Sequence, residues 1–463
     1  MSPAVLGRHG QDVVAAGRRR SPPSAHGGEA VAKQQELLET MQNLTRHVGA
    51  VEQLRTSDEQ RGEKDMRLLR SPARRSVLRV TGVLITVLLV AAGSSAYAFA
   101  ARAESGQEVS GHAASGKPPA GLQQSADQMV ADGTPGVIIM TRRGHQVSDV
   151  VAGLADTATG QPMQAQDRVH IGSITKTFVA TVVLQLAAER RLSLNDSVQR
   201  WLPGVITGHG YDPARITIRQ LLHMTSGIRD YLDDPAFQDP KNPQPLGQTW
   251  RPQQLVDIAL GLGPPVHGWV YSNTNYILLG MNIQKVTGQS PISEISRRIL
   301  APLGLGDTSV PLTSKQIPVP YAHGYFGPVD VTHLVNPSVA WTAGAMISTV
   351  GDVARFYRAL LTGRLLSPAQ LRELLTAMPV DDTGELFPEH YGLGIYSVQL
   401  SCGTAWGHDG GWPGGFKTIA YTGRDGSRQA VMVYNNFLMS ENPTAAFQRD
   451  EKQALEIAFC GRR

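Results

Sequence analysis

Cysteine is scarce in this chain, which holds only Cys402 and Cys460 among its 463 residues. Neither belongs to a C-x-x-C pair or to a cluster of Cys and His with metal-ligand spacing, so we expect no zinc or redox centre. The nucleophile signature G-x-S-x-G and the zinc-peptidase signature H-E-x-x-H are also absent. These absences argue against an α/β-hydrolase and against a zinc peptidase.

Net charge is the second feature that most of the chain lacks. Residues 1–79 hold 14 of the 43 Lys and Arg residues and 9 of the 39 Asp and Glu residues. Residues 80–463 therefore hold 29 basic and 30 acidic residues. A domain that binds nucleic acid usually carries a basic patch or stripe, and we therefore expect no nucleic-acid partner. A hydrophobic content of 41% and a charged content of 18% indicate a folded body with a large core.

The N-terminal region is basic and has few folding signals. Residues 1–30 are rich in Gly, Pro, Ser and Arg, and residues 30–64 can form a polar helix with a narrow apolar stripe. We interpret residues 1–79 as a partly disordered cytoplasmic tail. Residues 80–101 then run without a charge, and about 20 apolar residues suffice to span a bilayer. The arginines just before this segment keep their side cytoplasmic, so the body would lie outside.

Two interpretations of residues 80–101 remain open. The segment is either a single-pass anchor or an export signal that is cleaved after the A-x-A sequence ending at Ala98. Arg74 and Arg75 also fit a twin-arginine signal. Under both interpretations the catalytic domain is extracytoplasmic, either membrane-anchored or secreted.

The remaining chain reads as a linker, residues 102–121, and one catalytic domain, residues 122–463. Strand patterns occur near both ends of this domain, at residues 136–140, 147–151, 391–399, 404–407, 416–422 and 429–436. The segments between them are mainly helical, and a last helix covers residues 443–459. This order predicts an α+β fold, in which a mainly antiparallel sheet is built from both chain ends, flanked by helices and interrupted by a helical subdomain.

The functional interpretation depends on Ser173-Ile174-Thr175-Lys176, a Ser-x-x-Lys that opens an apolar helical run reaching about Ala188. Residues three apart share one face of a helix, so the hydroxyl of Ser173 and the amine of Lys176 can touch. A serine becomes nucleophilic when an adjacent base takes its proton, and a lysine is such a base when burial lowers its pKa. The sequence therefore offers a candidate nucleophile and its base.

Two later elements can complete this site. Tyr271-Ser272-Asn273, just before a predicted helix, supplies a phenol that can relay protons and an amide that can orient a substrate amide. His408, in the glycine-rich stretch 406–412 at the end of a predicted strand, supplies a donor or a positive charge. Each of these two elements alone fits a capping or turn role. Because both follow the Ser-x-x-Lys in this order, we interpret them as parts of one active site.

The order and spacing of these elements resemble the penicillin-recognising serine hydrolases, which comprise class C β-lactamases, D-Ala-D-Ala carboxypeptidases and related esterases. The resemblance covers roughly residues 122–460. Further matching stretches are residues 221–227, similar to the family's LLxHTSG, residues 271–276, similar to YSNxxY, and residues 343–349 with Asp352, similar to AGGLxST..D. The resemblance implies a serine β-lactamase-like fold, no cofactor and no metal.

The resemblance also assigns roles to residues. It implies that Ser173 is the nucleophile that becomes acylated and that Lys176 accepts or relays its proton. Tyr271 would protonate the leaving group and take part in activating water, and Asn273 would bind the acyl-side amide of the substrate. The backbone amides of Ser173 and Gly411 would form the oxyanion hole.

The third motif departs from the family pattern. His408 stands where other members carry Lys or His, but Asp409, which with Gly410 is expected to line the substrate site, replaces the usual Thr or Ser of members that bind a substrate carboxylate. An ionised aspartate repels a carboxylate. If Asp409 faces the cavity, it favours an esterase or amidase whose substrate has no terminal carboxylate. Lys417 is either a counter-cation for Asp409 or a solvated strand residue.

We therefore expect a serine acyl hydrolase that works through an acyl-enzyme. A D-alanyl-D-alanine carboxypeptidase acting on peptidoglycan peptides is the leading hypothesis, because the third motif begins with His and the body lies outside the cytoplasm. A class C-like β-lactamase or a carboxylic-ester hydrolase follows, and a β-lactam receptor without turnover is the alternative from a different class. We expect a monomer with a small-molecule or peptide substrate. In an exported body, a disulfide between Cys402 and Cys460 is favoured over two free thiols.

Overall fold

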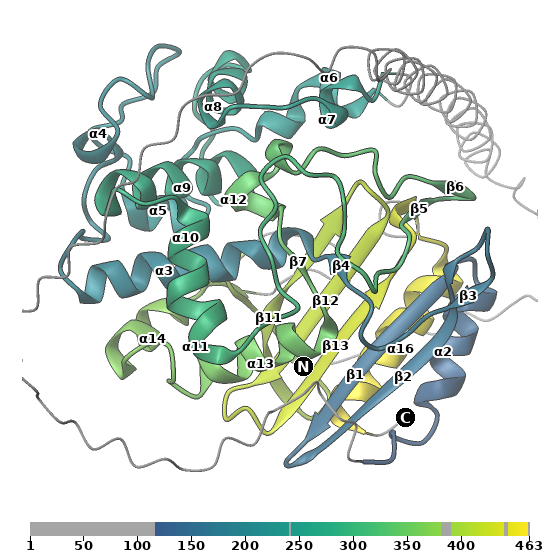
Figure 1. Cartoon of the computed structure of the whole chain (residues 1–463). Coiled ribbons are helices and arrows are strands. Elements are labelled where there is room, and N and C mark those ends of the chain that lie inside the picture. Colours follow the sequence, from purple (N-terminus) through teal and green to yellow (C-terminus); the bar gives the residue numbers. More distant parts are fainter. Residues whose placement is uncertain (1–115, 240–241, 381–389, 439–442, 462–463) are drawn as a thin grey trace, which may run out of the picture.

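Both ends of the catalytic domain build one nine-stranded antiparallel sheet in the computed structural model, which describes residues 116–239, 242–380, 390–438 and 443–461 (Figure 1). The strand order is β3-β2-β1-β13-β12-β11-β10-β9-β8. The predicted α+β class, with its helical insert, is confirmed. The basic tail and the apolar segment 80–101 lie outside the described residues.

The centre of the sheet joins the two chain ends. Strand β1 pairs with β13 in a register that places Val137 opposite Tyr434. Both strands are short apolar runs rich in Val, Ile and Met, and nearly all their side chains are buried, as expected for strands covered on both faces. The sheet consists of β1 (Gly136–Arg143), β2 (Gln146–Asp156), β3 (Gln161–Pro162), β8 (Met378–Pro379), β9 (His390–Tyr391), β10 (Tyr396–Leu400), β11 (Gly403–Trp412), β12 (Phe416–Gly423) and β13 (Arg428–Tyr434).

Helices cover the two faces of the sheet (Figure 1). On one face, α2 (Leu122–Ala131) and α16 (Ala445–Cys460) pack against each other and against β1. On the other face, α13 (Val350–Leu361) packs on β12 and β13, and α3 (Thr175–Ala188) lies against α13 through stacked rings of Phe178 and Phe356, whose centroids are 3.6 Å apart. The helix α3 is buried almost all round, which fixes its first turn, the site of the Ser-x-x-Lys.

The inserted region is mainly helical and packs around α9 and α12. Its α-helices are α4 (Val198–Trp201), α5 (Ile218–Leu222), α6 (Pro235–Gln238), α7 (Gln244–Gly247), α8 (Pro252–Gly261), α9 (Asn273–Thr287), α10 (Pro291–Ile295), α11 (Ala301–Leu303), α12 (Trp341–Gly344) and α14 (Pro368–Leu374). Short turns of other helix types are η1 (Gly172–Ile174), η2 (Tyr231–Asp233), η3 (Ser296–Leu300) and η4 (Pro337–Val339). Two small sheets pair β4 (Val169–His170) with β7 (Ile347–Ser348) and β5 (Tyr325–Phe326) with β6 (Val329–Asp330).

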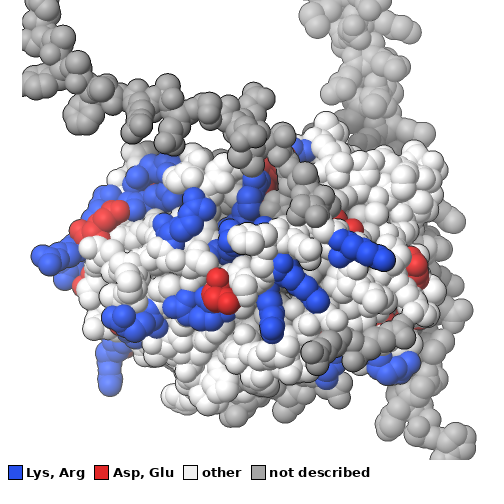
Figure 2. Space-filling model, turned by 90° about the horizontal axis from the view of Figure 1, so that it is seen from below, with Lys and Arg blue, Asp and Glu red and all other residues white. Residues whose placement is uncertain are grey.

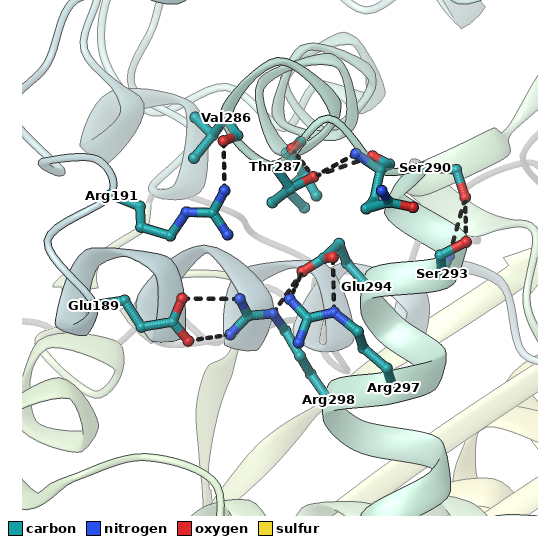
Figure 3. Close-up of polar contacts among 11 residues, drawn as sticks. Glu189, Arg191, Val286, Thr287, Ser290, Ser293, Glu294, Arg297 and Arg298 are labelled. Atoms are coloured by element: carbon teal, nitrogen blue, oxygen red, sulfur yellow. Dashed lines mark hydrogen bonds and ion pairs between the residues drawn. The ribbon is translucent and has the colours of Figure 1, made fainter. Parts of the chain in front are cut away.

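Buried arginine pairs connect this insert to α3. Glu294 is fully buried on α10 and accepts hydrogen bonds from Arg297, at 2.8 and 2.7 Å, and from Arg298, at 2.6 Å. Arg298 also forms an ion pair with Glu189 at the end of α3 (Figure 3). Because burying an unpaired carboxylate is costly, the two arginines allow Glu294 to lie inside the protein.

Two boundaries differ from the sequence prediction. Residues 216–227, which end at Gly227, predict one helix from their sequence. The helix spans only Ile218–Leu222, capped by Thr217, because the chain beyond His223 turns through Met224 with a positive φ of 60°. The stretch 406–412 is not a loop after a strand but lies within β11, which pairs with β12 as far as Trp412 opposite Phe416.

The expected disulfide between Cys402 and Cys460 is present and ties the end of α16 to the turn between β10 and β11. Within the described residues, no helix combines the length and hydropathy needed to cross a bilayer.

Candidate active site

Ser173 lies in the short turn η1, immediately before α3, and Lys176 lies in the first turn of that helix. The amine of Lys176 is 2.9 Å from Ser173 Oγ, so the predicted contact exists. The same amine donates hydrogen bonds to Asn273 Oδ1 at 2.7 Å and to the carbonyl of Ala343 at 2.8 Å. Three residues from distant parts of the chain thus surround one nitrogen.

The state of Lys176 follows from its burial and its partners. Burial lowers the pKa of Lys176 to about 7, against the opposing influence of the negative charges of Asp230 and Asp409. A neutral amine has two N–H donors and one lone pair. Since Asn273 Oδ1 and the carbonyl of Ala343 can only accept, they take both N–H groups, and the lone pair is left for the proton of Ser173. The geometry therefore makes Lys176 a base toward Ser173.

Asn273 is held by a buried carboxylate that the sequence analysis did not identify. Asp230, which is 7% exposed, accepts from Asn273 Nδ2 at 2.7 Å, from the Asn273 backbone N–H at 3.1 Å and from the Leu232 N–H at 3.1 Å. Burial raises the pKa of Asp230, and these N–H donors together with Lys176 oppose the rise. Because each of these donors is an N–H group, Asp230 fixes the Asn273 amide with its oxygen toward Lys176.

The stretch 221–227 supports the loop that carries Tyr271 and Asn273. The carbonyl of Met224 accepts from the Val270 N–H at 2.9 Å, and its sulfur lies 3.4 Å from the Ser272 nitrogen. Ser226 donates to Asn275 Oδ1 at 2.6 Å. The short α5 thus ends in a turn whose role is to position the second motif.

Tyr271 lies beside the nucleophile and its base. Burial raises the pKa of Tyr271 well above its usual value, and a hydrogen bond with Ser173 opposes that rise. The amine of Lys176 is 4.8 Å from the centroid of the Tyr271 ring. A phenol beside an ammonium is expected from the sequence to have a lowered pKa, and the structure indicates the reverse. Tyr271 therefore remains a protonated phenol, which can donate a proton.

His408 is neutral in this site. It is 1% exposed, and burial lowers its pKa to about 4. Its Nδ1 lies 2.5 Å from the carbonyl of Asp409 and its Nε2 lies 3.2 Å from the hydroxyl of Tyr391. Since a carbonyl can only accept, Nδ1 carries the hydrogen and Nε2 accepts from Tyr391. His408 thus supplies no positive charge, which removes one of the two roles that the sequence suggested for it.

Asp409 lines the cavity, and its side chain is 21% exposed. Burial alone would raise the pKa of Asp409, but Lys417 and hydrogen bonds hold it at about 2, so Asp409 is ionised. Its Oδ2 lies 2.5 Å from Lys417 Nζ, and its Oδ1 accepts from the Tyr396 hydroxyl at 3.2 Å. Of the two roles weighed for Lys417, the structure shows the counter-cation.

The strand β11 passes very close to the nucleophile turn. A Cβ on Gly410 would lie 2.0 Å from the carbonyl oxygen of Ile171 and 2.8 Å from Ser173 N. A Cβ on Gly172, whose φ is 52°, would lie 2.4 Å from the carbonyl oxygen of Gly411. Only glycine fits these two positions. The close approach brings Gly411 next to Gly172 and Gly410 next to the nitrogen of Ser173, in the region where the sequence predicts an oxyanion hole.

A cavity of about 460 Å³ opens onto these groups. Among the described residues that line it, Asp409 is the only acidic and Lys417 the only lysine or arginine side chain. Most of the remaining wall is apolar or aromatic and includes Trp269, Leu246 and Trp412. A larger groove of about 910 Å³, between the end of α3 and α14, contains no predicted site residue.

The structure brings all the predicted site residues together, and six of them line the cavity: Ser173, Tyr271, Asn273, His408, Asp409 and Gly411. Lys176 lies behind Ser173, and Gly410, which was expected to line the substrate site, lies against the backbone of Ile171 and Ser173 instead. Sequence reasoning missed Asp230 and the carbonyl of Ala343. Asp230 follows the 221–227 stretch by three residues, and an acidic residue so close to a motif was the available signal. The carbonyl of Ala343 had none, because a backbone acceptor leaves no mark on the residue type.

Comparison with known proteins agrees with this geometry. The family model described as Beta-lactamase matches residues 122–455. Penicillin-binding protein 4* of Bacillus subtilis is 28% identical over 345 residues, which cover 70% of this chain and 72% of that protein. The solved structure of a D-stereospecific amidohydrolase from Streptomyces sp. is 40% identical, with a TM-score of 0.67, over 75% of this chain and 100% of that one. A D-amino acid amidase from Ochrobactrum anthropi SV3 is 28% identical, with a TM-score of 0.62, over 72% and 99%.

Proposed function

The chain belongs to the beta-lactamase family of serine hydrolases, and from that premise we propose that it is an amidohydrolase that cleaves amides or esters of D-amino acids. The observation that carries the proposal is the ionised carboxylate of Asp409 in the cavity wall, paired with Lys417. A substrate carboxylate would meet this negative charge and a cation that is already paired. A substrate whose carboxyl group is masked as an amide or ester avoids that repulsion.

The first chemical step is acylation of Ser173. Lys176 takes the proton of the Ser173 hydroxyl as Oγ attacks the carbonyl carbon of the substrate. The backbone N–H groups of Ser173 and Gly411 then donate to the oxygen that becomes negative. Asn273 accepts from Lys176 through Oδ1 and donates one Nδ2 hydrogen to Asp230, so its second Nδ2 hydrogen is left to donate to the acyl side of the substrate.

The leaving group departs with a proton from Tyr271. Its raised pKa keeps the phenol protonated, and its contact with Ser173 places the hydroxyl near the breaking bond. The carbon–nitrogen or carbon–oxygen bond breaks, and an amine, ammonia or an alcohol leaves an ester on Ser173. Lys176 passes the proton that it took from Ser173 to Tyr271, which restores both groups. Water then attacks the ester and gives a proton to Lys176, Ser173 Oγ leaves and regains a proton from it, and a carboxylic acid is released.

Two relatives support the amide as substrate. The D-stereospecific amidohydrolase is 40% identical over its whole length, and the D-amino acid amidase matches almost as completely. The aromatic and apolar lining of the cavity also suits an apolar amino-acid side chain. The D configuration of the substrate is inferred from the names of these relatives.

A D-alanyl-D-alanine carboxypeptidase is the second candidate, and the similarity to penicillin-binding protein 4* favours it. Its substrate, a peptidoglycan peptide, ends in a carboxylate that would approach Asp409. This candidate therefore requires that Lys417 turn from Asp409 to the substrate. An extracytoplasmic position of the domain, which the sequence predicts, would suit it.

A steady-state panel separates the candidates. It compares D- and L-phenylalaninamide, a peptide ending in D-Ala-D-Ala, nitrocefin and a p-nitrophenyl ester. We expect kcat/KM for the D-amide to exceed that for the peptide by about tenfold or more, since one unfavourable buried charge contact is worth that much. The D-amide should also be cleaved faster than the L-amide, because the proposal assigns the site to the D configuration. Faster cleavage of the peptide than of the amide would support the carboxypeptidase instead.

The same panel with Asp409→Thr tests the observation that carries the proposal. Removing the negative charge should raise kcat/KM for the D-Ala-D-Ala peptide relative to the amide by about tenfold. Asp409→Asn is the matched control, because it keeps the shape and removes only the charge. An unchanged ratio in both variants would show that Asp409 does not influence substrate choice.

A further inference from the structure

Six arginines gather at the end of the molecule where the β1–β2 turn, the β12–β13 turn and the end of α13 meet. We call this surface the arginine face. Its members are Arg142, Arg143, Arg358, Arg364, Arg424 and Arg428. Figure 2, which views the molecule from below, shows many basic and few acidic side chains over this end.

Three hydrogen bonds hold these segments together. The Gly144 N–H donates to the Ser427 carbonyl at 2.7 Å, which joins the two turns. Arg424 donates to the carbonyl of Leu361 at the end of α13 at 2.5 Å. Arg142 Nε donates to Gln429 Oε1 at 2.9 Å. The arginine face is therefore part of the rigid sheet and not a set of independent loops.

One carboxylate, Asp425 in the β12–β13 turn, lies among these arginines; it accepts hydrogen bonds from Ser427 and attracts Arg428 without forming an ion pair with it. Arg143 donates to the Ile457 carbonyl and Arg428 to the Cys402 carbonyl, both neutral acceptors. Within the described part of the chain, none of the six arginines forms an ion pair. Burial and, second, repulsion by Arg358 lower the pKa of Arg142. Burial and repulsion by Arg428 likewise lower the pKa of Arg143. With six arginines and one aspartate, the face carries a net positive charge.

Several arginines elsewhere in the molecule form ion pairs with carboxylates. Arg297 and Arg298 hold the buried Glu294, and Arg298 also pairs with Glu189 (Figure 3). Arg168 pairs with Asp307. Some other arginines, such as Arg191 and Arg229, also donate only to carbonyls, so what distinguishes the arginine face is that six arginines lie together on it.

The chain enters the folded body beside this face. The Gly116 N–H, at the first described residue, donates to the carbonyl of Val147 near the start of β2, next to the β1–β2 turn. The apolar segment 80–101 precedes Gly116 by the 14 residues 102–115. A chain of that length spans at most about 50 Å. If residues 80–101 remain as a membrane anchor, the chain that leaves this anchor joins the folded body beside the arginine face.

The catalytic cavity lies at the other end of β11. Arg428 contacts the carbonyl of Cys402, just before β11 begins at Gly403, and Gly411 lies near the end of the strand at Trp412. With a rise of about 3.3 Å per residue, roughly 30 Å separate the two ends of this segment. Contact through the arginine face would leave the cavity free.

We propose that the arginine face binds the phosphate groups of anionic lipid headgroups at a membrane surface. Guanidinium groups match phosphate oxygens in charge and geometry and cannot be deprotonated in proteins. The position of the entering chain favours a membrane over a soluble polyanion. The contact orients the domain with its cavity away from the bilayer.

Vesicle binding by the full-length protein tests the proposal. The variant Arg358→Gln/Arg364→Gln/Arg428→Gln removes three exposed charges from the face. The control Arg200→Gln/Arg215→Gln/Arg251→Gln removes three exposed charges near α4 and α8, at the opposite end of the molecule (Figure 1). Both keep the tail and residues 80–101, so any binding by those segments is common to all three proteins. Unchanged ester hydrolysis in solution shows that each variant is folded.

We expect the face variant to partition onto vesicles of phosphatidylcholine with phosphatidylglycerol on the order of 10- to 100-fold more weakly than the wild type at low salt. The control should bind like the wild type, vesicles of phosphatidylcholine alone should not distinguish the proteins, and high salt should remove the difference. Equal loss in both variants would mean that only net charge matters. Binding of the wild type to soluble polyphosphate but not to anionic vesicles would overturn the membrane as partner.

Discussion

The active site and the arginine face differ in whether a basic side chain keeps its positive charge. At the cavity, Lys176 is buried and surrounded by fixed acceptors, and its pKa falls to about 7. On the arginine face, the guanidinium groups lie at the surface without carboxylate partners and stay charged at any physiological pH. A lysine can serve as a base because burial can remove its charge, whereas an arginine can only attract. Lysine therefore suits the active site, where a base is needed, and arginine suits the surface, where a permanent charge is needed.

The function of a lysine near the cavity depends on its hydrogen-bond partners as well as on its burial. Lys417 lines the cavity and lies against the carboxylate of Asp409, which is ionised, whereas Lys176 lies behind Ser173 and is not part of the cavity wall. Lys176 has neutral oxygens as its direct partners, with Asp230 one residue further away behind Asn273. Two lysines near one cavity thus differ in function because one contacts a carboxylate directly and the other does not.

Removing the nucleophile should give the largest effect and leave the arginine face unaltered. Ser173→Ala should lower kcat/KM on the order of 10⁴-fold or more and abolish labelling by a fluorophosphonate or a penicillin, because no other group can form the acyl-enzyme. Mass spectrometry of the labelled protein measures this directly. Ser272→Ala, in the second motif, is the control and should still be labelled. Labelling of the Ser173 variant would show that another serine is the nucleophile.

Removing the phenol should have the next largest effect. Tyr271→Phe keeps the ring beside Lys176 and deletes the proton donor to the leaving group, so we expect a loss of roughly 10²- to 10⁴-fold in kcat/KM. The loss should be greatest for amides, whose leaving nitrogen needs a proton, and smaller for p-nitrophenyl esters, whose leaving group does not. Equal losses on both substrates would argue against this role.

Substitution of Asp230 tests whether this carboxylate, which reaches Lys176 only through Asn273, influences the pKa of Lys176. Asp230→Asn lets the Asn273 amide rotate away from Lys176, and we expect kcat/KM on its plateau to fall about 10- to 100-fold. In the wild type, kcat/KM should rise as pH passes about 7, where Lys176 loses its proton. Since the charge of Asp230 raises the pKa of Lys176, its removal should move this limb to lower pH.

The matched control for Asp230 is the exposed Asp233, three residues further along the same turn. Asp233→Asn should leave both the plateau and the pH limb unchanged. Asp230→Glu, which keeps the charge, should retain the position of the limb even if the plateau falls. A lower plateau with an unmoved limb in Asp230→Asn would indicate a purely structural role.

The sequence made the main features of the fold and the site predictable for identifiable reasons. Apolar runs at both chain ends marked the sheet, and the Ser-x-x-Lys spacing placed two side chains on one helical turn. The neutral state of His408 was not predictable, because it depends on burial by Tyr391 and Tyr396, which are distant in the chain. The strand through residues 406–412 was missed because its glycines, which permit the approach to Ser173, are also typical of a loop.

The charge distribution shows a further limit of sequence analysis. Counting residues gave a body without net charge, which is correct as a sum and excludes a uniformly basic surface. It could not reveal the arginine face, because Arg142, Arg358 and Arg428 are far apart in sequence and meet only through the pairing of β1 with β13 and the packing of α13 on β13. Local charge is a property of topology as much as of composition.

The smallest expected effect on catalysis comes from opening the disulfide at the arginine end. Cys402 and Cys460 are 58 residues apart, and a bridge over such a loop contributes about 2–4 kcal/mol to the free energy of unfolding, chiefly by restricting the unfolded chain. Cys402→Ser/Cys460→Ser should therefore lower the melting temperature measured by calorimetry. The kcat/KM should change by less than about twofold, because the bridge lies the length of β11 away from Ser173 and additivity holds for distant sites. A large loss of kcat/KM in protein that is still folded would instead mean that strain at the arginine end reaches Gly410 and Gly411 along β11, and the two ends could then no longer be treated as independent.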